Sequence, residues 1–139
     1  MKAILLFFVA VMALIAGYNN FIYPEINLNF VRHTFMMDTT YDSRQRRRAI
    51  TSPLVHNLAH YGIAVAELIC GALCLIGAGL HLVKSAHAKA VATAGLVTGI
   101  GIWFFGFRAI AGEWFGMWQS REYNGLPDGE RIALALLVI

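Results

Sequence analysis

Hydrophobic residues in this chain are gathered into three long runs, which polar segments separate from one another. A helix over the first run, from the N-terminus to about residue 21, reaches about 30 Å, which is enough to cross a bilayer. The second run is longer and opens on Ser52 and Pro53, a good N-cap followed by a good first helical residue. The pattern predicts three transmembrane helices, at about residues 1–21, 53–83 and 88–119.

The segment of residues 22–52, between the first two runs, is polar but has internal order. After Pro24, apolar side chains recur near helical spacing, which predicts a short helix lying on the membrane surface. Thr39 is a candidate N-cap for a second short helix, with Asp42 at its third position and four arginines behind it. We interpret the arginine cluster as a solvated helix end that touches lipid phosphates; a docking patch for a partner is the alternative.

The end of the sequence is a short apolar stretch, IALALLVI. These residues span only about 12 Å as a helix, too little to cross a membrane. They predict the start of a fourth helix, at about residues 130–139, whose remainder is missing. The predicted fold class is therefore all-α. We expect a single membrane domain over residues 1–139, an antiparallel four-helix bundle with an incomplete fourth helix and an ordered extracytoplasmic loop between helices one and two.

Composition agrees with a membrane protein, since 58% of the residues are hydrophobic and only 14% are charged, against about a quarter charged in ordinary globular domains. The net charge of +3 is explained by Lys and Arg beside the membrane. No basic face with interleaved aromatic residues suggests nucleic acid, so we expect none as a partner. Cys70 and Cys74 are four residues apart on a helix, a spacing that rarely suits a disulfide, and are interpreted as small packing residues.

The third run is rich in small residues, with Gly95 and Gly99 four apart and Ala88 and Ala92 before them. Such spacing lets helices approach closely in lipid. The loops are rich in Trp, Tyr and Arg, which are favoured at interface hot spots. No nucleophile arrangement, P-loop or dinucleotide fingerprint is present. These features favour a non-catalytic accessory or assembly subunit of a larger membrane complex, such as a respiratory one, with the bilayer and other membrane subunits or further copies of the chain as partners.

Unusual polar residues are expected to gather near one membrane face. The candidate structural or functional polar cluster consists of His33, Asp38, Glu67, Arg108, Glu113, Trp114, Trp118 and Gln119. Trp114 and Trp118, four residues apart, are expected to share a helix face in an interfacial aromatic belt. A carboxylate at the depth of Glu67 is costly unless it is protonated or paired. We predict a Glu67–Arg108 pair; the alternatives are a hydrogen bond to Tyr or Trp, protonation, or a small transporter or ion carrier that uses Glu67.

His56 and His60 are one helical turn apart and could bind one metal ion, with Glu113, His33 or Asp38 completing the site. The favoured interpretation is that both histidines hydrogen-bond to loop backbone or lipid headgroups. A transmembrane haem needs histidines on facing helices at one depth, and the third helix has only His87, at its opposite end. Metal, haem or quinone binding at the outer face is therefore the alternative function, and no cofactor is the favoured expectation.

Several motifs resemble those of a bacterial family of small integral membrane proteins, the domain of unknown function 2165 family. They are NFVRHTFMMDTTY at 29–41, RAITSP at 48–53, His56 with Tyr61 and Glu67, AKAVATAGL at 88–96, GEWFGMWQS at 112–120 and YNG at 123–125. The family's pattern has tryptophan where this chain has Arg47 and Tyr123, and it does not usually place Arg at position 108. The resemblance implies a complete fourth helix in family members and gives no activity.

Two sequence signals predict opposite orientations in the membrane. Counting Lys and Arg alone puts the arginine-rich loop in the cytoplasm. The resemblance implies instead a cytoplasmic N-terminus in the bacterial inner membrane, and the acids and the length of that loop suggest a folded unit rather than a bare positive stretch. We therefore expect the N-terminus and the segment KSAHAK at 84–89 inside, and both motif loops outside.

Overall fold

The computed structural model describes all residues, 1–139, and every regular element in it is helical. The elements are α1 (Lys2–Ile22), α2 (Pro24–Met36), η1 (Gln45–Arg48), α3 (Pro53–Leu82), α4 (Ala88–Ile100), η2 (Gly101–Trp114), η3 (Met117–Gln119) and α5 (Leu126–Leu137). Three helices are long and apolar enough to cross a membrane: Lys2–Ile22, Pro53–Leu82 and Ala88–Trp114. The all-helical class and the presence of three candidate spans are confirmed.

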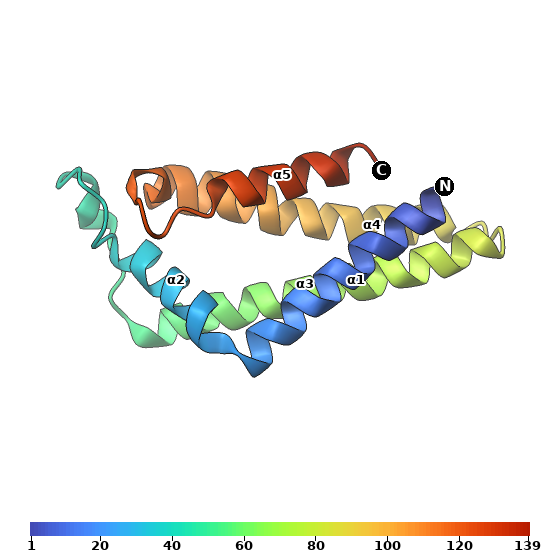
Figure 1. Cartoon of the computed structure of the whole chain (residues 1–139), viewed down its shortest axis with the longest axis horizontal. Coiled ribbons are helices and arrows are strands. Elements are labelled where there is room, and N and C mark those ends of the chain that lie inside the picture. The colour runs from blue at the N-terminus through green and yellow to red at the C-terminus, as the bar shows by residue number, and fades with distance from the viewer.

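Helix α1 packs antiparallel along α3, and the two cross at an angle (Figure 1). Small residues at the crossing allow the close approach. A side chain on Gly17 would meet Leu68, and one on Gly71 would meet Leu14, each at under 3.0 Å. The α1 residues Ala10 and Ala13 have no exposed surface at all. This seam therefore depends on residues that bring two backbones together, as expected in lipid, where contact replaces the hydrophobic effect.

Helix α4 returns alongside α3, and here the small-residue face of the third span is used within the chain. A Cβ on Gly95 would lie 2.7 Å from the sulfur of Cys74, and one on Gly99 would lie 3.1 Å from the sulfur of Cys70. Both cysteines are free and fully buried, as the packing interpretation predicts. The glycine spacing that suggested a partner subunit is therefore satisfied by the protein's own α3.

The third span changes its winding at Gly101 and continues as a π-helix, η2, to Trp114. The amide of Phe115 donates to the carbonyl of Ile110, which is the hydrogen-bond spacing of a π-helix. The helix then breaks at Gly116, whose φ of 66° lies in the left-handed region. The prediction of a continuous helix over 88–119 is wrong beyond Trp114: Trp118 belongs to the separate turn η3, and the two tryptophans do not share a helix face.

The polar segment after α1 contains the predicted short helix, α2, which begins at Pro24. The second predicted helix, capped by Thr39, is wrong. Only the 3-10 turn η1 forms there, and no side chain caps it. The Asp42 carboxylate instead accepts the backbone amide of Arg44 at 3.0 Å, so a local turn replaces the helix start.

Helix α5 runs back along η2, with Leu126 against Gly112 and Gly129 against Phe107. It begins at Leu126, earlier than predicted, because Pro127 can occupy the first turn of a helix without losing a hydrogen bond. Its 12 residues extend about 18 Å, less than the thickness of a bilayer.

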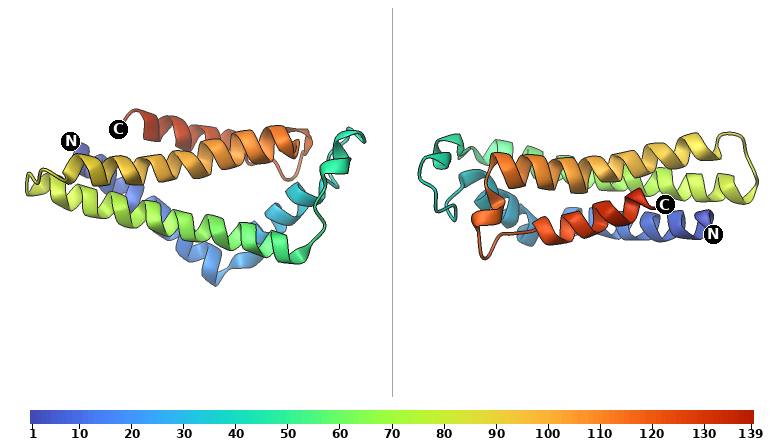
Figure 2. Two further views of the ribbon diagram at one scale, coloured as in Figure 1. Left: turned by 180° about the vertical axis from the view of Figure 1, so that it is seen from behind. Right: turned by 90° about the horizontal axis from the view of Figure 1, so that it is seen from above.

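Both chain ends lie toward the same end of the molecule, and α2, η1 and η3 lie at the other (Figures 1 and 2). Residues 23–52 and 114–125, at that other end, are called the loop layer below.

Candidate functional site

Glu67 is a buried carboxyl side chain in the middle of α3. It is 5% exposed and faces α1, where Asn20 Nδ2 donates to its Oε2 at 2.6 Å. Asn20 is itself 5% exposed. Glu67 is also the single Asp, Glu, Lys or Arg in α3. A carboxyl group in a membrane-spanning helix is thus held by a neutral amide.

The predicted Glu67–Arg108 pair is wrong. Arg108 instead binds Glu113 at 3.2 Å and Glu130 at 3.3 Å. The reason is that the two side chains lie on helix faces that pack against different neighbours. Glu67 shares its face of α3 with His60 and Gly71, and that face packs on α1, whereas Arg108 lies where η2 packs on α5. The two residues are on neighbouring helices but belong to different seams.

His56 and His60 each use a ring nitrogen on a backbone carbonyl. His56 Nε2 lies 2.7 Å from the carbonyl oxygen of Ile50, and His60 Nε2 lies 3.0 Å from that of Asn20. Both rings are buried. No group of three or more His, Cys, Asp or Glu side chains is placed to hold a metal ion. Glu113 pairs with Arg108 and does not join the two histidines. Both histidines instead form hydrogen bonds with backbone carbonyls.

Within the loop layer, His33 and Asp38 form a pair at 2.7 Å, and the His33 ring stacks on Tyr123 with centroids 4.1 Å apart. This contact joins α2 to the segment before α5. Asp38 is exposed, and His33 is partly buried. His33 and Asp38 do meet, and the contacts of His33 join α2 to the segment before α5.

Gln119 forms two hydrogen bonds that join the two segments of the loop layer. Its Oε1 accepts the backbone amide of Asp42 at 3.1 Å, and its Nε2 donates to Gln45 Oε1 at 2.8 Å. Arg48 Nη1 donates to the carbonyl of Trp114 at 2.9 Å, and its guanidinium lies 5.0 Å from the Trp114 ring centroid. Segments about seventy residues apart in the chain are joined in this way. The residues of GEWFGMWQS therefore hold the two loops together.

The predicted polar cluster is thus three separate groups rather than one site. Glu67 lies in the α1–α3 seam, Arg108 and Glu113 lie in the η2–α5 seam, and His33, Asp38, Trp114, Trp118 and Gln119 belong to the loop layer. Sequence reasoning missed Asn20 and Glu130. A signal existed for Asn20, which is a polar residue in the last turn of an apolar helix. Glu130 has no comparable signal, because its partner depends on how α5 folds back.

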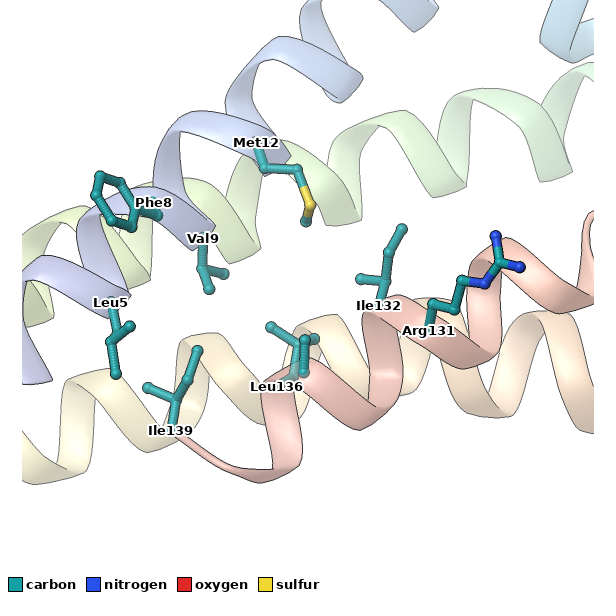
Figure 3. Close-up of a pocket in the computed structure, with 9 residues that line it drawn as sticks. Leu5, Phe8, Val9, Met12, Arg131, Ile132, Leu136 and Ile139 are labelled. Carbon is teal, nitrogen blue, oxygen red and sulfur yellow. The ribbon is translucent and has the colours of Figure 1, made fainter.

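A groove of about 360 Å³ lies between α1 and α5 (Figure 3). Eight of its nine lining residues are hydrophobic, among them Phe8, Met12 and Ile132, and Arg131 stands at one end. Arg131 binds Asp128 at 3.3 Å. An apolar groove on a membrane-spanning surface offers contact to lipid chains or to another helix rather than to a polar substrate.

The whole chain, residues 1–139, matches one protein family, described as predicted small integral membrane protein. Neither the curated proteins nor the solved structures give a match to the chain. The family match agrees with the three apolar spans and with the all-helical fold. The chain is therefore a small integral membrane protein of unknown function that belongs to the domain of unknown function 2165 family.

Proposed function

We propose that this protein is a non-catalytic accessory or assembly subunit of a larger membrane complex, and that it binds its partner through the loop layer. The observation that carries the proposal is that this layer is prebuilt. Gln119 and Arg48 tie residues 37–52 to residues 114–119 through the bonds described above. The ring of Phe35 also stacks on that of Phe115, with centroids 4.6 Å apart. A surface that is ordered before binding loses less conformational entropy when it binds.

The exposed residues of the loop layer are those that carry binding energy in interfaces. Tyr41 is 68% exposed, Trp114 55% and Trp118 46%, and the rings of Tyr41 and Trp118 pack edge to face. Trp and Tyr beside Arg are typical of hot spots. Four arginines stand against two aspartates between residues 37 and 52. The partner that this charge fits is a membrane protein with an acidic segment at the same membrane face.

Native mass measurement after gentle extraction tests this proposal. The tagged chain is released from its native membranes in mild detergent, with a photo-crosslinking residue at position 118 or, as the control, at the exposed position of Phe105 in the membrane span. We expect a heteromeric complex of defined mass that is cross-linked from position 118 and not from 105. Replacement of Tyr41 and Trp118 by alanine should dissociate it, whereas Phe105→Ala should not. Recovery of only the isolated chain or its homo-oligomer would overturn the proposal.

We also propose that the protein lies in the bacterial inner membrane with its N-terminus in the cytoplasm and the loop layer outside. The four arginines of residues 44–48 form bonds within the fold; for example, Arg46 Nε donates to the Thr40 carbonyl and Arg47 Nε to the Arg44 carbonyl. Folded domains and long loops cross the membrane largely regardless of their charge, and a segment that folds as α2 and η1 is closer to a small domain than to a bare run of positive charge. This supports the orientation implied by the family resemblance over the one implied by the Lys and Arg count.

Cysteine accessibility in intact cells decides the orientation. The native Cys70 and Cys74 are buried, so a membrane-impermeant maleimide reports on introduced cysteines alone. We expect Ser43→Cys, in the loop layer, to be labelled, and Ser85→Cys, between α3 and α4, to be labelled only after the cells are lysed. The reverse pattern would place the loop layer in the cytoplasm.

A further inference from the structure

Glu67 has no cationic partner. The ion pairs of the structure involve His33 with Asp38, Arg44 with Asp42, Arg108 with Glu113 and Glu130, and Arg131 with Asp128. None of them reaches α3. A carboxylate buried in hydrocarbon without a cation is costly, and ionisable groups in such positions mark ion or proton pathways. This raises the question of how the protein accommodates Glu67.

The partner that the protein supplies, Asn20, suits both protonation states of a carboxyl group. An amide N–H can donate to an oxygen of the carboxylate or to the carbonyl oxygen of the neutral acid. An arginine in the same place would hold the group in the charged state. The 2.6 Å contact between Asn20 Nδ2 and Glu67 Oε2 therefore holds the carboxyl in position without fixing its charge.

A second amide orients the first one and leads to the surface. Asn27 Nδ2, on α2, donates to Asn20 Oδ1 at 2.6 Å, so the NH₂ group of Asn20 must point at Glu67. Asn27 is exposed, and it stands at the membrane face that carries the loop layer. Glu67, Asn20 and Asn27 thus form a continuous chain of hydrogen bonds from the interior of the span to this face.

No ion pair reaches Glu67 from any element packed against α3. Helix α2, which packs on α3 at the loop-layer end, carries Glu25, Arg32 and His33, and His33 pairs with Asp38. On α3 itself the titratable neighbours are His60, toward the loop layer, and Cys70, one turn deeper. The facing helix α1 contributes the neutral Asn20, and no titratable residue occurs between Lys89 and Arg108 in α4 and η2. The charged residues of α5, namely Asp128, Glu130 and Arg131, pair with one another or with Arg108.

We propose that Glu67 is a reversible proton-binding site within the membrane span, and that it exchanges its proton with water at the loop-layer face through the Asn20–Asn27 end of the α1–α3 seam. The carboxylate takes one proton from hydronium and becomes the neutral acid, and the reverse step returns it; no electron moves. The ligand is a proton, and the site is independent of partner binding by the loop layer.

Labelling with dicyclohexylcarbodiimide tests the site, with the full chain in liposomes. The apolar reagent enters the bilayer and reacts with a neutral carboxylic acid, whose O–H adds across a C=N bond to leave an adduct on the oxygen that rearranges to a stable N-acylurea. Mass spectrometry should find one adduct on Glu67, and its yield should fall as the buffer goes from mildly acidic to mildly alkaline. Glu67→Gln should lose the adduct, whereas the exposed-carboxylate controls Glu25→Gln and Glu122→Gln should keep it.

Asn20→Leu should keep the adduct to more alkaline buffer than the unaltered chain does, because the carboxylate form loses its neutral donor. Infrared difference spectra of the unaltered chain provide a measurement that needs no variant to fold. Between mildly acidic and mildly alkaline buffer, an interval in which exposed carboxylates are already ionised, they should show the carbonyl stretch of a neutral carboxylic acid and its replacement by carboxylate bands. Absence of a Glu67 adduct together with an unchanging infrared spectrum would overturn the proposal.

Discussion

Glu67 and Arg108 lie in neighbouring membrane-spanning helices, and the protein accommodates them in opposite ways. In the η2–α5 seam, Arg108 is shared by two carboxylates at 3.2 and 3.3 Å, and its side chain is 42% exposed. In the α1–α3 seam, Glu67 is 5% exposed and receives only an amide hydrogen bond, from Asn20. The first arrangement holds charges together, and the second holds a single group whose charge is free to change.

The difference shows what each seam can do. Opposite charges in mutual contact stabilise the charged state of all their members, so Arg108, Glu113 and Glu130 have a structural role in docking α5 on η2. A carboxyl that only a neutral donor holds keeps both protonation states within reach. The bonding partner of an ionisable side chain, rather than its position in the membrane, therefore decides whether the side chain has a structural role or can change its protonation state.

The largest effect is expected when the shared cation is removed. Arg108→Met leaves Glu113 and Glu130 facing each other without compensation. We expect the free energy of unfolding in mixed detergent micelles to fall by about 2 kcal/mol, below the roughly 3–5 kcal/mol of a fully buried pair, because the side chain is 42% exposed. Arg108→Lys, which keeps the charge, should recover part of the loss. Unchanged stability in Arg108→Met would show that the seam does not depend on charge.

The next largest effect is expected when Glu67 loses its partner. Asn20→Leu keeps the branched shape of the side chain but leaves a buried carboxyl oxygen without a donor, and we expect a loss of about 1–2 kcal/mol. The measurement is the same unfolding equilibrium. Asn27→Leu, at an exposed position, serves as the control and should cost about half as much or less. Equal losses in both variants would mean that Asn20 acts by packing rather than by its bond to Glu67.

Glu67→Gln should stabilise the protein slightly at neutral pH, by about 1 kcal/mol, because glutamine keeps an acceptor for Asn20 and is never charged. The pH dependence gives a second readout. If the folded chain holds a proton on Glu67, unfolding releases it, so the stability of the unaltered chain should fall as pH rises above about 4.3, where an exposed glutamate ionises. Glu67→Gln should remove this component of the slope, and an identical slope in both proteins would contradict a neutral Glu67.

The smallest effect is expected for a single carboxylate of the Arg108 group. Glu130→Gln leaves Glu113 on the guanidinium at 3.2 Å, so the loss should be about 0.5 kcal/mol or less. The double variant Glu113→Gln, Glu130→Gln should lose more than the sum of the two single variants, since each carboxylate compensates for the absence of the other. Additive losses would show that Arg108 does not couple the two residues.

Several features were predictable from the sequence because they depend on local rules. Apolar runs predict the three spans, Pro24 and Pro53 mark two helix starts, and the small residues of the third span indicate a close helix contact. The partner of that contact was not predictable, because Gly95 would fit another subunit as well as it fits α3. The predictions of a helix capped by Thr39 and of a shared face for Trp114 and Trp118 were wrong for a related reason. Long-range hydrogen bonds from Gln119 and Arg48, and the helix break at Gly116, override local helix preference.

The sequence by itself determined that this is a helical membrane protein of a known family, how many helices can span the bilayer, and that Glu67 is an ionisable group inside one of them. Only the tertiary structure decided which groups meet, namely Glu67 with Asn20 and Arg108 with Glu113 and Glu130. The physical reason is that spacing along a chain sets a residue's depth in the membrane, whereas the rotation of each helix about its axis decides which neighbour it faces. That rotation results from the packing of all the helices together.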